Sequence, residues 1–186
     1  MENRKLELAT FGGGCFWCTE AIFKRIKGVK SVTSGYSGGS IDSPTYEQVS
    51  GGKTGYAESV QIKFDPTVIS YNKLLQIFFA THDPTSLNRQ GADIGTQYRS
   101  VIFYHDQKQK EEAGKMLKEI EKSGKYQDSI VTDITPFKNF YTAEEYHQNF
   151  YDQNPNYSYC TLVIDPKIQK LIEEFNGELK DEFKNR

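Results

Sequence analysis

Two of the three cysteines in this 186-residue chain flank its only tryptophan, directly after three glycines at positions 12–14. Consecutive glycines cost backbone entropy, so they indicate a loop of special geometry or a close approach to the backbone. If a helix begins near Cys15, its unpaired amides and its dipole favour a thiolate and lower the pKa of the thiol. Cys15 is therefore a candidate nucleophile, and the alternative is a buried thiol that only packs.

The residues after Cys15 could line a pocket or complete a redox pair. Adjacent residues on a helix point about 100° apart, so Phe16 and Trp17 cannot face the same core, and at least one should line a surface or a pocket. Cys18 could form a redox couple with Cys15, bind a metal with it, or only pack. The three histidines have no zinc-like spacing to this pair, so we expect no metal and no other cofactor.

A carboxyl group stands at the head of an apolar strand pattern. Strict alternation up to Phe64 puts Glu58 on the same face as Val60 and Ile62. Burial raises the pKa of a carboxyl group, so Glu58 could stay protonated near neutral pH and act as a general acid. The alternative is an edge glutamate whose carboxylate reaches water, and alternation alone does not choose between them.

Periodicity predicts a mixed succession of strands and helices around these side chains. Strands are expected at 6–10, 29–36, 55–64, 98–104 and 130–134, and helices from 15 to 28, from 70 to 79, and at 106–122, 142–152 and 165–182. Two of the helix starts rest on capping signals, with Ser70 as an N-cap and Thr142 with Glu145 as a capping box. Residues 82–95 form a long polar loop, a common place for functional residues.

This order of elements predicts one α+β domain over residues 1–186. Its mixed β-sheet is covered by helices, as in a ferredoxin-like two-layer α/β sandwich elaborated with a C-terminal helix at about 165–182. The 23 basic and 25 acidic residues are interspersed, which disfavours nucleic acid or an anionic membrane as a partner. With no long apolar run and only three cysteines, we expect a soluble, cytoplasmic protein. In such a reducing compartment thiols are in general more often catalytic or metal-binding than paired in structural disulfides.

Several short motifs occur in one order along the chain. They are Gly14-Cys-Phe-Trp17, Pro44-Thr-Tyr46, Gly55-Tyr-Ala-Glu58, Asp83-Pro84, Gly95-Thr-Gln-Tyr-Arg-Ser100, Tyr146-His-Gln148 and Asn154-Pro155. In these motifs the chain resembles the A class of the peptide methionine sulfoxide reductase family, with a reductase core over about residues 5–170. The resemblance implies reduction of the S epimer of methionine sulfoxide, free or within oxidised proteins, and hence protein repair.

The resemblance also implies roles for individual residues. The Cys15 thiolate would attack the sulfoxide sulfur, while Phe16 and Trp17 hold the methyl group of the substrate. Methionine would then leave, and Cys15 would become a sulfenic acid.

The remaining roles concern the sulfoxide oxygen. Glu58 would protonate this oxygen as the S–O bond breaks. Tyr46 and Tyr98 would hydrogen-bond it, and Asp93 in the long loop would support this network.

A second thiol must attack the sulfenic acid, and the resemblance implies that thioredoxin reduces the resulting disulfide. Cys160 matches the recycling cysteine of many relatives, and Cys18 matches the resolving cysteine of others. We favour Cys160, because a Cys-x-x-Cys pair within a helix can close only if the first cysteine lies at the helix start. We expect a monomer.

Two other functions are compatible with the residues. One is a thioredoxin-like thiol–disulfide oxidoreductase using Cys15 and Cys18, which would not depend on Glu58, although no proline stands between or beside these cysteines. The other is a non-enzymatic module that binds exposed methionine through Phe16 and Trp17.

Overall fold

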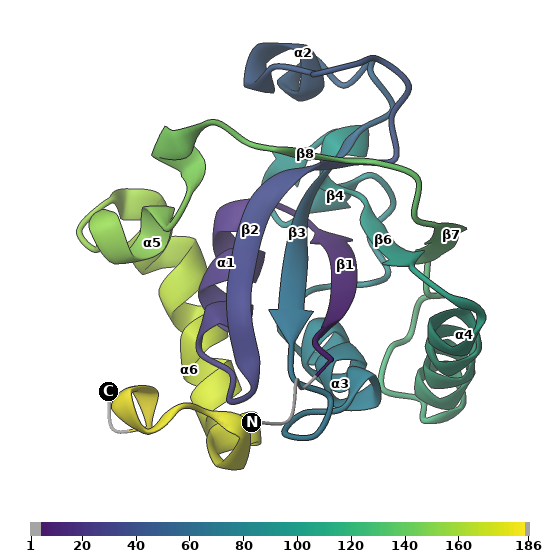
Figure 1. The fold of residues 1–186 in the computed structure, drawn as a ribbon, viewed down its shortest axis with the longest axis vertical. Coiled ribbons are helices and arrows are strands. Elements are labelled where there is room, and N and C mark those ends of the chain that lie inside the picture. Colours follow the sequence, from purple (N-terminus) through teal and green to yellow (C-terminus); the bar gives the residue numbers. More distant parts are fainter. Residues whose placement is uncertain (1–4, 185–186) are drawn as a thin grey trace.

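The computed structural model describes residues 5–184, and its centre is a six-stranded sheet with the order β7-β6-β1-β3-β2-β8 (Figure 1). The strands are β1 Glu7–Gly13, β2 Val29–Ser37, β3 Ala57–Phe64, β6 Ser100–Tyr104, β7 Asp133–Pro136 and β8 Phe140–Thr142. Neighbouring strands are antiparallel except for β6 and β7, which run parallel. A separate hairpin pairs β4 (Arg89–Gln90) with β5 (Asp93–Ile94).

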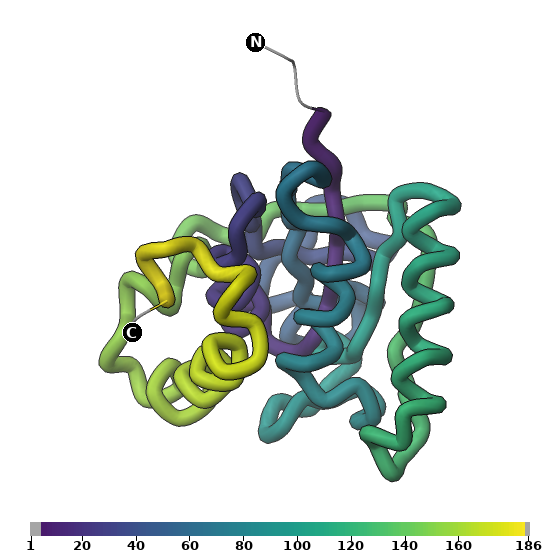
Figure 2. Tube along the Cα trace, turned by 90° about the horizontal axis from the view of Figure 1, so that it is seen from below, coloured from purple at the N-terminus to yellow at the C-terminus, as the bar shows by residue number. Residues whose placement is uncertain are grey.

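The helices flank this sheet. In the described part of the chain, they are α1 Phe16–Lys24, α2 Tyr46–Ser50, α3 Tyr71–Thr81, α4 Gln107–Lys122, α5 Phe150–Gln153 and α6 Asp165–Phe175. Figure 2 shows α4 on one side of the molecule and α6 with the C-terminal segment on the other, with α3 between them. None of these helices is long and apolar enough to cross a membrane.

The order of the elements along the chain and in the sheet confirms the predicted fold. The succession β1-α1-β2-β3-α3-β6, with its strands side by side in the order β6-β1-β3-β2, is the ferredoxin-like arrangement. To it are added the edge strands β7 and β8, the surface helix α4 and the C-terminal helix α6 (Figure 1). The α+β class and the mixed sheet follow the prediction.

The core lies between the sheet and the helices α1 and α3. On β3 the residues Glu58, Val60, Ile62 and Phe64 are all nearly or fully buried, as alternation predicts. The ring of Phe11 on β1 stacks on Phe78 of α3 at 4.9 Å between centroids. Each fully buried apolar side chain contributes about 1.5–3 kcal/mol through removal from water, so this face holds β1 and β3 firmly.

The sheet is strongly curled. β7 lies at one edge and β8 at the other, yet only residues 137–139 connect them. Since an extended chain advances by at most about 3.6 Å per residue, the two edges must approach each other. Phe137 crosses here and packs on Ala57, Val101 and Phe103, which form a second, smaller core.

One predicted helix is wrong. Residues 142–152 do not form a continuous helix, because Thr142 ends β8, where it pairs with Gly35 of β2. Glu144 turns inward and Asn149 has a φ of 56°, which interrupts helical geometry. Only a 3₁₀ turn at Glu145–His147 and the short α5 remain. Tertiary pairing of β8 thus overrides the local capping signal.

Other boundaries differ from the predictions by a few residues. The strand expected at 98–104 begins at Ser100, after a 3₁₀ turn at Thr96–Tyr98, and the one expected at 130–134 lies at Asp133–Pro136. The helix α1 ends at Lys24, before Gly28. The last helix ends at Phe175, because Leu179 forms a β-bridge with Ile26 and the chain turns back along α1.

Candidate active site

Cys15 lies at the junction between β1 and α1. β1 pairs with β3 from Glu7 to Phe11 and with β6 from Thr10 to Gly13, so its position is determined by the sheet. Cys15 is the N-cap of α1, with φ −56° and ψ 127°, and its carbonyl accepts from the Cys18 amide at 3.1 Å. The predicted helix start near Cys15 is therefore confirmed.

The glycines before Cys15 allow a close approach of other segments. Gly14 has a φ of +93°, which L residues rarely adopt, and a Cβ there would lie 2.6 Å from Cβ of Gln90. A Cβ on Gly13 would lie 2.9 Å from the Phe78 ring. The glycines thus let α3 and the β4–β5 hairpin pack directly against the backbone leading to Cys15.

Glu58 lies beside this helix start. Its carboxyl group is 2% exposed, and its Oε2 accepts a hydrogen bond from the Phe16 amide at 3.0 Å. Burial raises the pKa of Glu58 to about 8, against the opposing effect of that hydrogen bond. The carboxyl group is therefore protonated at neutral pH, which is the environment that a general acid requires.

The two neighbouring thiols differ in their acidity. Burial, a hydrogen bond with Cys18 and the charge of Glu58 raise the pKa of Cys15 well above its ordinary value. A hydrogen bond with Cys15 lowers the pKa of Cys18 to about 7, although burial opposes this shift. The expectation that the helix start makes Cys15 the thiolate is wrong for the substrate-free protein, because burial outweighs the nearby backbone amides.

The two aromatic residues after Cys15 face different surroundings, as their adjacency on a helix predicts. Phe16 is buried, with its ring 5.0 Å from that of His147. Trp17 is half-buried, stacks on Phe150 at 3.7 Å, and donates its Nε1–H to Nδ1 of His147 at 3.1 Å. His147 therefore fixes the orientation of both rings.

Two tyrosine hydroxyls lie within electrostatic range of this site. Burial, followed by the charges of Glu58 and Cys15, raises the pKa of Tyr46 to about 12. The pKa of Tyr98 is also raised, by burial and then by the charge of Glu58. Both hydroxyls are therefore protonated donors near the thiol and the carboxyl group.

The carboxylate of Glu144 holds Tyr46 in position. Glu144 accepts from the Tyr46 amide at 2.8 Å and from the Tyr36 hydroxyl at 2.7 Å. Neither Glu144 nor His147 was predicted as a site residue, although His147 lies within one of the quoted motifs. An isolated glutamate in a polar segment gives no local signal, because its partners are about a hundred residues away.

Asp93 lies within electrostatic range of the expected network, since its charge contributes to the raised pKa values of Glu58, Tyr46 and Tyr98, and it has one further partner. Its Oδ2 accepts from the Tyr159 hydroxyl at 2.5 Å, and the Tyr159 oxygen lies 3.7 Å from Sγ of Cys18. Asp93 thus reaches the cysteine pair through Tyr159. Nothing in the sequence pointed to Tyr159, because a tyrosine alone carries no functional signal.

The third cysteine is fully buried. Cys160 begins a π-helical turn, Cys160–Ile164, that runs directly into α6. All three cysteines are free thiols, and the charge of Cys18 contributes to a raised pKa at Cys160, after burial and Asp165. Cys160 therefore lies near Cys18, whereas Cys15 is in direct hydrogen-bond contact with Cys18.

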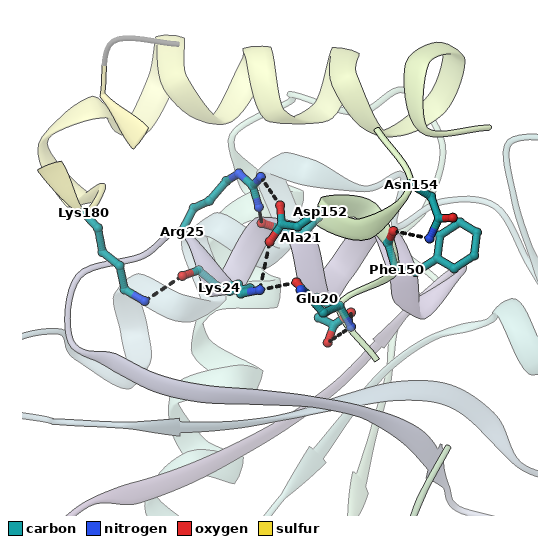
Figure 3. A network of polar contacts seen from close by, with 9 residues as sticks. Glu20, Ala21, Lys24, Arg25, Phe150, Asp152, Asn154 and Lys180 are labelled. Carbon is teal, nitrogen blue, oxygen red and sulfur yellow. Dashed lines mark hydrogen bonds and ion pairs between the residues drawn. The ribbon is translucent and has the colours of Figure 1, made fainter. Parts of the chain in front are cut away.

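A polar network anchors α1 to α5 at the far end of the site (Figure 3). Lys24 and Arg25 both contact Asp152, at 2.8 and 2.9 Å, and Lys180 donates to the Lys24 carbonyl at 2.8 Å. Buried Glu20 accepts from the backbone amide that precedes Phe150. The network thereby keeps the Phe150 ring against the active-site tryptophan.

Comparison with known proteins agrees with this geometry. Residues 7–180 match the family described as peptide methionine sulfoxide reductase. The chain belongs to this family. The peptide methionine sulfoxide reductase MsrA of Sulfolobus acidocaldarius is 58% identical over 170 residues, which cover 91% of this chain and 96% of the relative.

Solved structures of the family are also similar. Reduced Mxr1 from Saccharomyces cerevisiae matches with a TM-score of 0.76 and 40% identity, covering 86% of this chain and 91% of the yeast chain. Mxr1 in complex with Trx2 matches with a TM-score of 0.54 and 30% identity, covering 80% and 87% of the two chains. The predicted membership of the methionine sulfoxide reductase family is thus confirmed.

Proposed function

We propose that this reductase converts the S epimer of methionine sulfoxide, peptide-bound or free, to methionine and thereby repairs oxidised proteins. The observation that carries the proposal is the buried, protonated carboxyl group of Glu58 at the helix start that holds Cys15. Cleavage of the S–O bond needs a thiol nucleophile with a proton donor beside it.

In the proposed first step, the sulfur of Cys15 bonds to the sulfoxide sulfur and the S–O bond then breaks. Glu58 gives its proton to the departing oxygen, and the proton lost by Cys15 restores the Glu58 carboxyl group. The hydroxide formed in this way then bonds to the Cys15 sulfur, while the bond between Cys15 and the substrate sulfur breaks and its electron pair returns to the substrate. The products are methionine and a Cys15 sulfenic acid, so the substrate is reduced by two electrons and the thiol is oxidised by two.

The aromatic and hydroxyl groups around Cys15 fit the substrate in this step. The half-buried Trp17, together with Phe16, offers apolar contact for the methyl group. The protonated hydroxyls of Tyr46 and Tyr98 are donors for the sulfoxide oxygen. All of these groups come from one chain, so the proposed step needs no residue from a second copy.

A thiol then attacks the sulfenic acid to form a disulfide and release water. The hydrogen bond between Cys15 and Cys18, and the non-helical backbone of Cys15, support Cys18 for this first disulfide. Cys160, near Cys18, stays a candidate for receiving the disulfide by exchange. We propose thioredoxin as the final reductant, because the yeast relative Mxr1 has been solved in complex with Trx2.

The direct test is to incubate the protein with each sulfoxide epimer and dithiothreitol and to follow methionine by chromatography. We expect consumption of the S epimer alone, and no consumption by Cys15→Ser. Cys160→Ser serves as the matched control, since dithiothreitol can reduce an oxidised Cys15 directly. Retained activity in Cys15→Ser, or consumption of neither epimer by the unaltered protein, would refute the proposal.

A further inference from the structure

Tyr159 connects the cysteine pair to a carboxylate. Its oxygen lies 3.7 Å from Sγ of Cys18 and 2.5 Å from Oδ2 of Asp93. The three residues come from separate parts of the chain, namely α1, the turn before the π-helical segment, and β5. The tertiary fold brings these three residues into contact. The proposed steps of substrate binding and proton donation to the sulfoxide make no use of this contact.

The direction of these hydrogen bonds follows from proton counting. A tyrosine hydroxyl carries one proton, and the 2.5 Å contact assigns it to the Asp93 carboxylate, which can only accept. Toward a protonated Cys18 the Tyr159 oxygen is therefore the acceptor. Cys15 in turn is hydrogen-bonded to Cys18, so a continuous chain of donors and acceptors runs from Cys15 to Asp93.

Cys18 also lines a small cavity of about 10 Å³, together with the titratable side chains of His82 and Lys167. Both ring nitrogens of His82 are engaged, with the Phe78 carbonyl at 2.6 Å and the Ser100 hydroxyl at 2.7 Å. The Lys167 ammonium can only donate, and the cavity is barely large enough for one water.

The Tyr159 ring is held in place for this contact. It meets Trp17 edge-on, with 5.8 Å between centroids and an interplanar angle of 81°. Because the ring packs against an active-site side chain, the hydroxyl has little freedom to leave Cys18 or Asp93. A positioned acceptor of this kind is what proton transfer from a thiol requires.

We propose that Tyr159 and Asp93 form a relay that removes the proton of Cys18 when its sulfur attacks the Cys15 sulfenic acid. The inference rests on the proposed function. The Cys18 proton passes to the Tyr159 oxygen while the Tyr159 proton passes to Asp93. The new S–S bond forms as the S–O bond of Cys15 breaks, and the departing hydroxide takes a proton from solvent and leaves as water, while Asp93 returns its proton to solvent.

The relay separates the two candidate resolving thiols. Cys160 is fully buried, and burial followed by the charge of Asp165 raises its pKa. Cys18 has the Tyr159 oxygen as an acceptor and Lys167 nearby as a cation that favours its thiolate. The relay therefore gives Cys18 the faster reaction with the sulfenic acid and leaves Cys160 to later disulfide exchange.

The test is a single turnover without reductant, in which methionine and the Cys15–Cys18 disulfide are measured separately by rapid quench and peptide mapping. Tyr159→Phe keeps the ring but removes the acceptor, and Tyr157→Phe, two residues away, is the matched control. We expect the ratio of the disulfide rate to the methionine rate to fall about tenfold or more in Tyr159→Phe at pH 6.5, and to stay unchanged in the control.

The pH profile separates a relay from a merely structural role. In the unaltered enzyme, disulfide formation should rise with pH through the pKa of Cys18, near 7, and in Tyr159→Phe, which lacks the hydroxyl that lowers this pKa, the rise should move to higher pH. Asp93→Asn removes a charge that raises the Cys18 pKa, so a purely electrostatic role predicts a faster disulfide step at pH 6.5, whereas the relay predicts a slower one. The titratable groups that face Cys18 are Cys15, Tyr159, Lys167, Asp93, Glu58 and His82, with Cys160 nearby. Cys15 and Tyr159 are hydrogen-bonded to Cys18, whereas Asp93 reaches it only through Tyr159.

Each outcome distinguishes the relay from the proposed function. Absence of methionine in the unaltered enzyme would refute the proposed function. Normal methionine release with an unaltered disulfide rate and pH profile in Tyr159→Phe would overturn the relay alone. A slower methionine step with a normal disulfide step in Asp93→Asn would instead place Asp93 at the sulfoxide oxygen and overturn the relay.

Discussion

The two halves of the site are built in different ways. Cys15 and Glu58 stand on β1, β3 and the start of α1, which are paired and buried at the centre of the sheet. Tyr159 and Cys160 stand in an irregular stretch that has a short turn and a π-helical segment before α6. In the proposed mechanism, the step that breaks the S–O bond depends on the rigid half. Recycling of the thiol combines Cys18 of α1 with Tyr159 and Cys160 of the irregular half.

The difference follows from what each step requires. Proton donation to a departing oxygen depends on fixed distances, which paired central strands provide. Disulfide exchange moves a bond from one sulfur to another, so the segment that carries the later thiol must change position. A π-helical turn is a local departure from regular helical pairing, and such turns are frequent at functional sites.

Replacing the buried acid should give the largest effect in the rigid half. Glu58→Gln keeps an acceptor for the Phe16 amide but cannot donate an acidic proton. We expect the single-turnover rate of methionine formation to fall by about 10²- to 10⁴-fold, with a modest change in substrate binding. An unaltered rate would show that Glu58 is not the general acid. It would also contradict the assignment of the S–O bond step to the rigid half.

The pH dependence of stability should report the same group. The pKa of Glu58 is raised to about 8 in the folded protein, above its ordinary value of 4.5, so burying it destabilises the fold progressively as pH rises from about 4.5 to 8. The melting temperature of Glu58→Gln should therefore exceed that of the unaltered protein more at pH 8 than at pH 5. An equal difference at both pH values would show that Glu58 titrates normally.

The cysteine variants compare the two halves, since Cys18 lies in α1 and Cys160 in the π-helical segment. Cys18→Ser and Cys160→Ser should both retain turnover with dithiothreitol, because this reductant can act on an oxidised Cys15 directly. With thioredoxin, we expect Cys18→Ser to lose about tenfold or more in rate and Cys160→Ser to lose less, since Cys18 is in hydrogen-bond contact with Cys15. A greater loss in Cys160→Ser would instead favour Cys160 as the first resolving thiol.

A glycine substitution should show how closely the two halves meet. Gly14→Ala places a Cβ 2.6 Å from Gln90 Cβ at a φ of +93°, so we expect a loss of about 1–3 kcal/mol in the free energy of unfolding. Gly114→Ala in α4 is the control, because nothing lies within 4 Å of its Cβ and alanine favours a helix. Denaturant titration of both variants measures the difference in the free energy of unfolding. Equal values for the two variants would show that the β4–β5 hairpin can shift away from position 14 at little cost.

The smallest effect is expected at the anchor between α1 and α5. Asp152→Asn weakens two ion pairs that are partly open to solvent, so we expect a loss of about 1 kcal/mol or less, which added salt reduces. Glu119→Gln, in the exposed pair with Lys115, should change nothing measurable. Thermal melting at low and high salt checks both, and a large, salt-independent loss would mean that α5 depends on Asp152 for folding.

Local signals in the sequence predicted the regular elements best. Alternation identified β3 with Glu58 on its buried face, and Ser70 is the N-cap of α3 as expected. The same reasoning failed at Thr142, where a capping signal was overridden by pairing of β8 with β2. Capping signals report preferences worth about 1 kcal/mol, and a strand pairing that buries apolar surface exceeds them.

The sequence by itself determined the fold class through periodicity and the family through the resemblance of several motifs, because both are local properties of the chain. The roles of the reactive residues are proposals that rest on the same motifs. Only the tertiary structure decided that Cys18, and not Cys15, has the lower pKa, and that Asp93 reaches Cys18 through Tyr159. These properties depend on burial and on contacts between residues 66 and 141 positions apart. Desolvation and long-range contacts leave no periodic trace in a sequence, which is why they had to be observed in the folded chain.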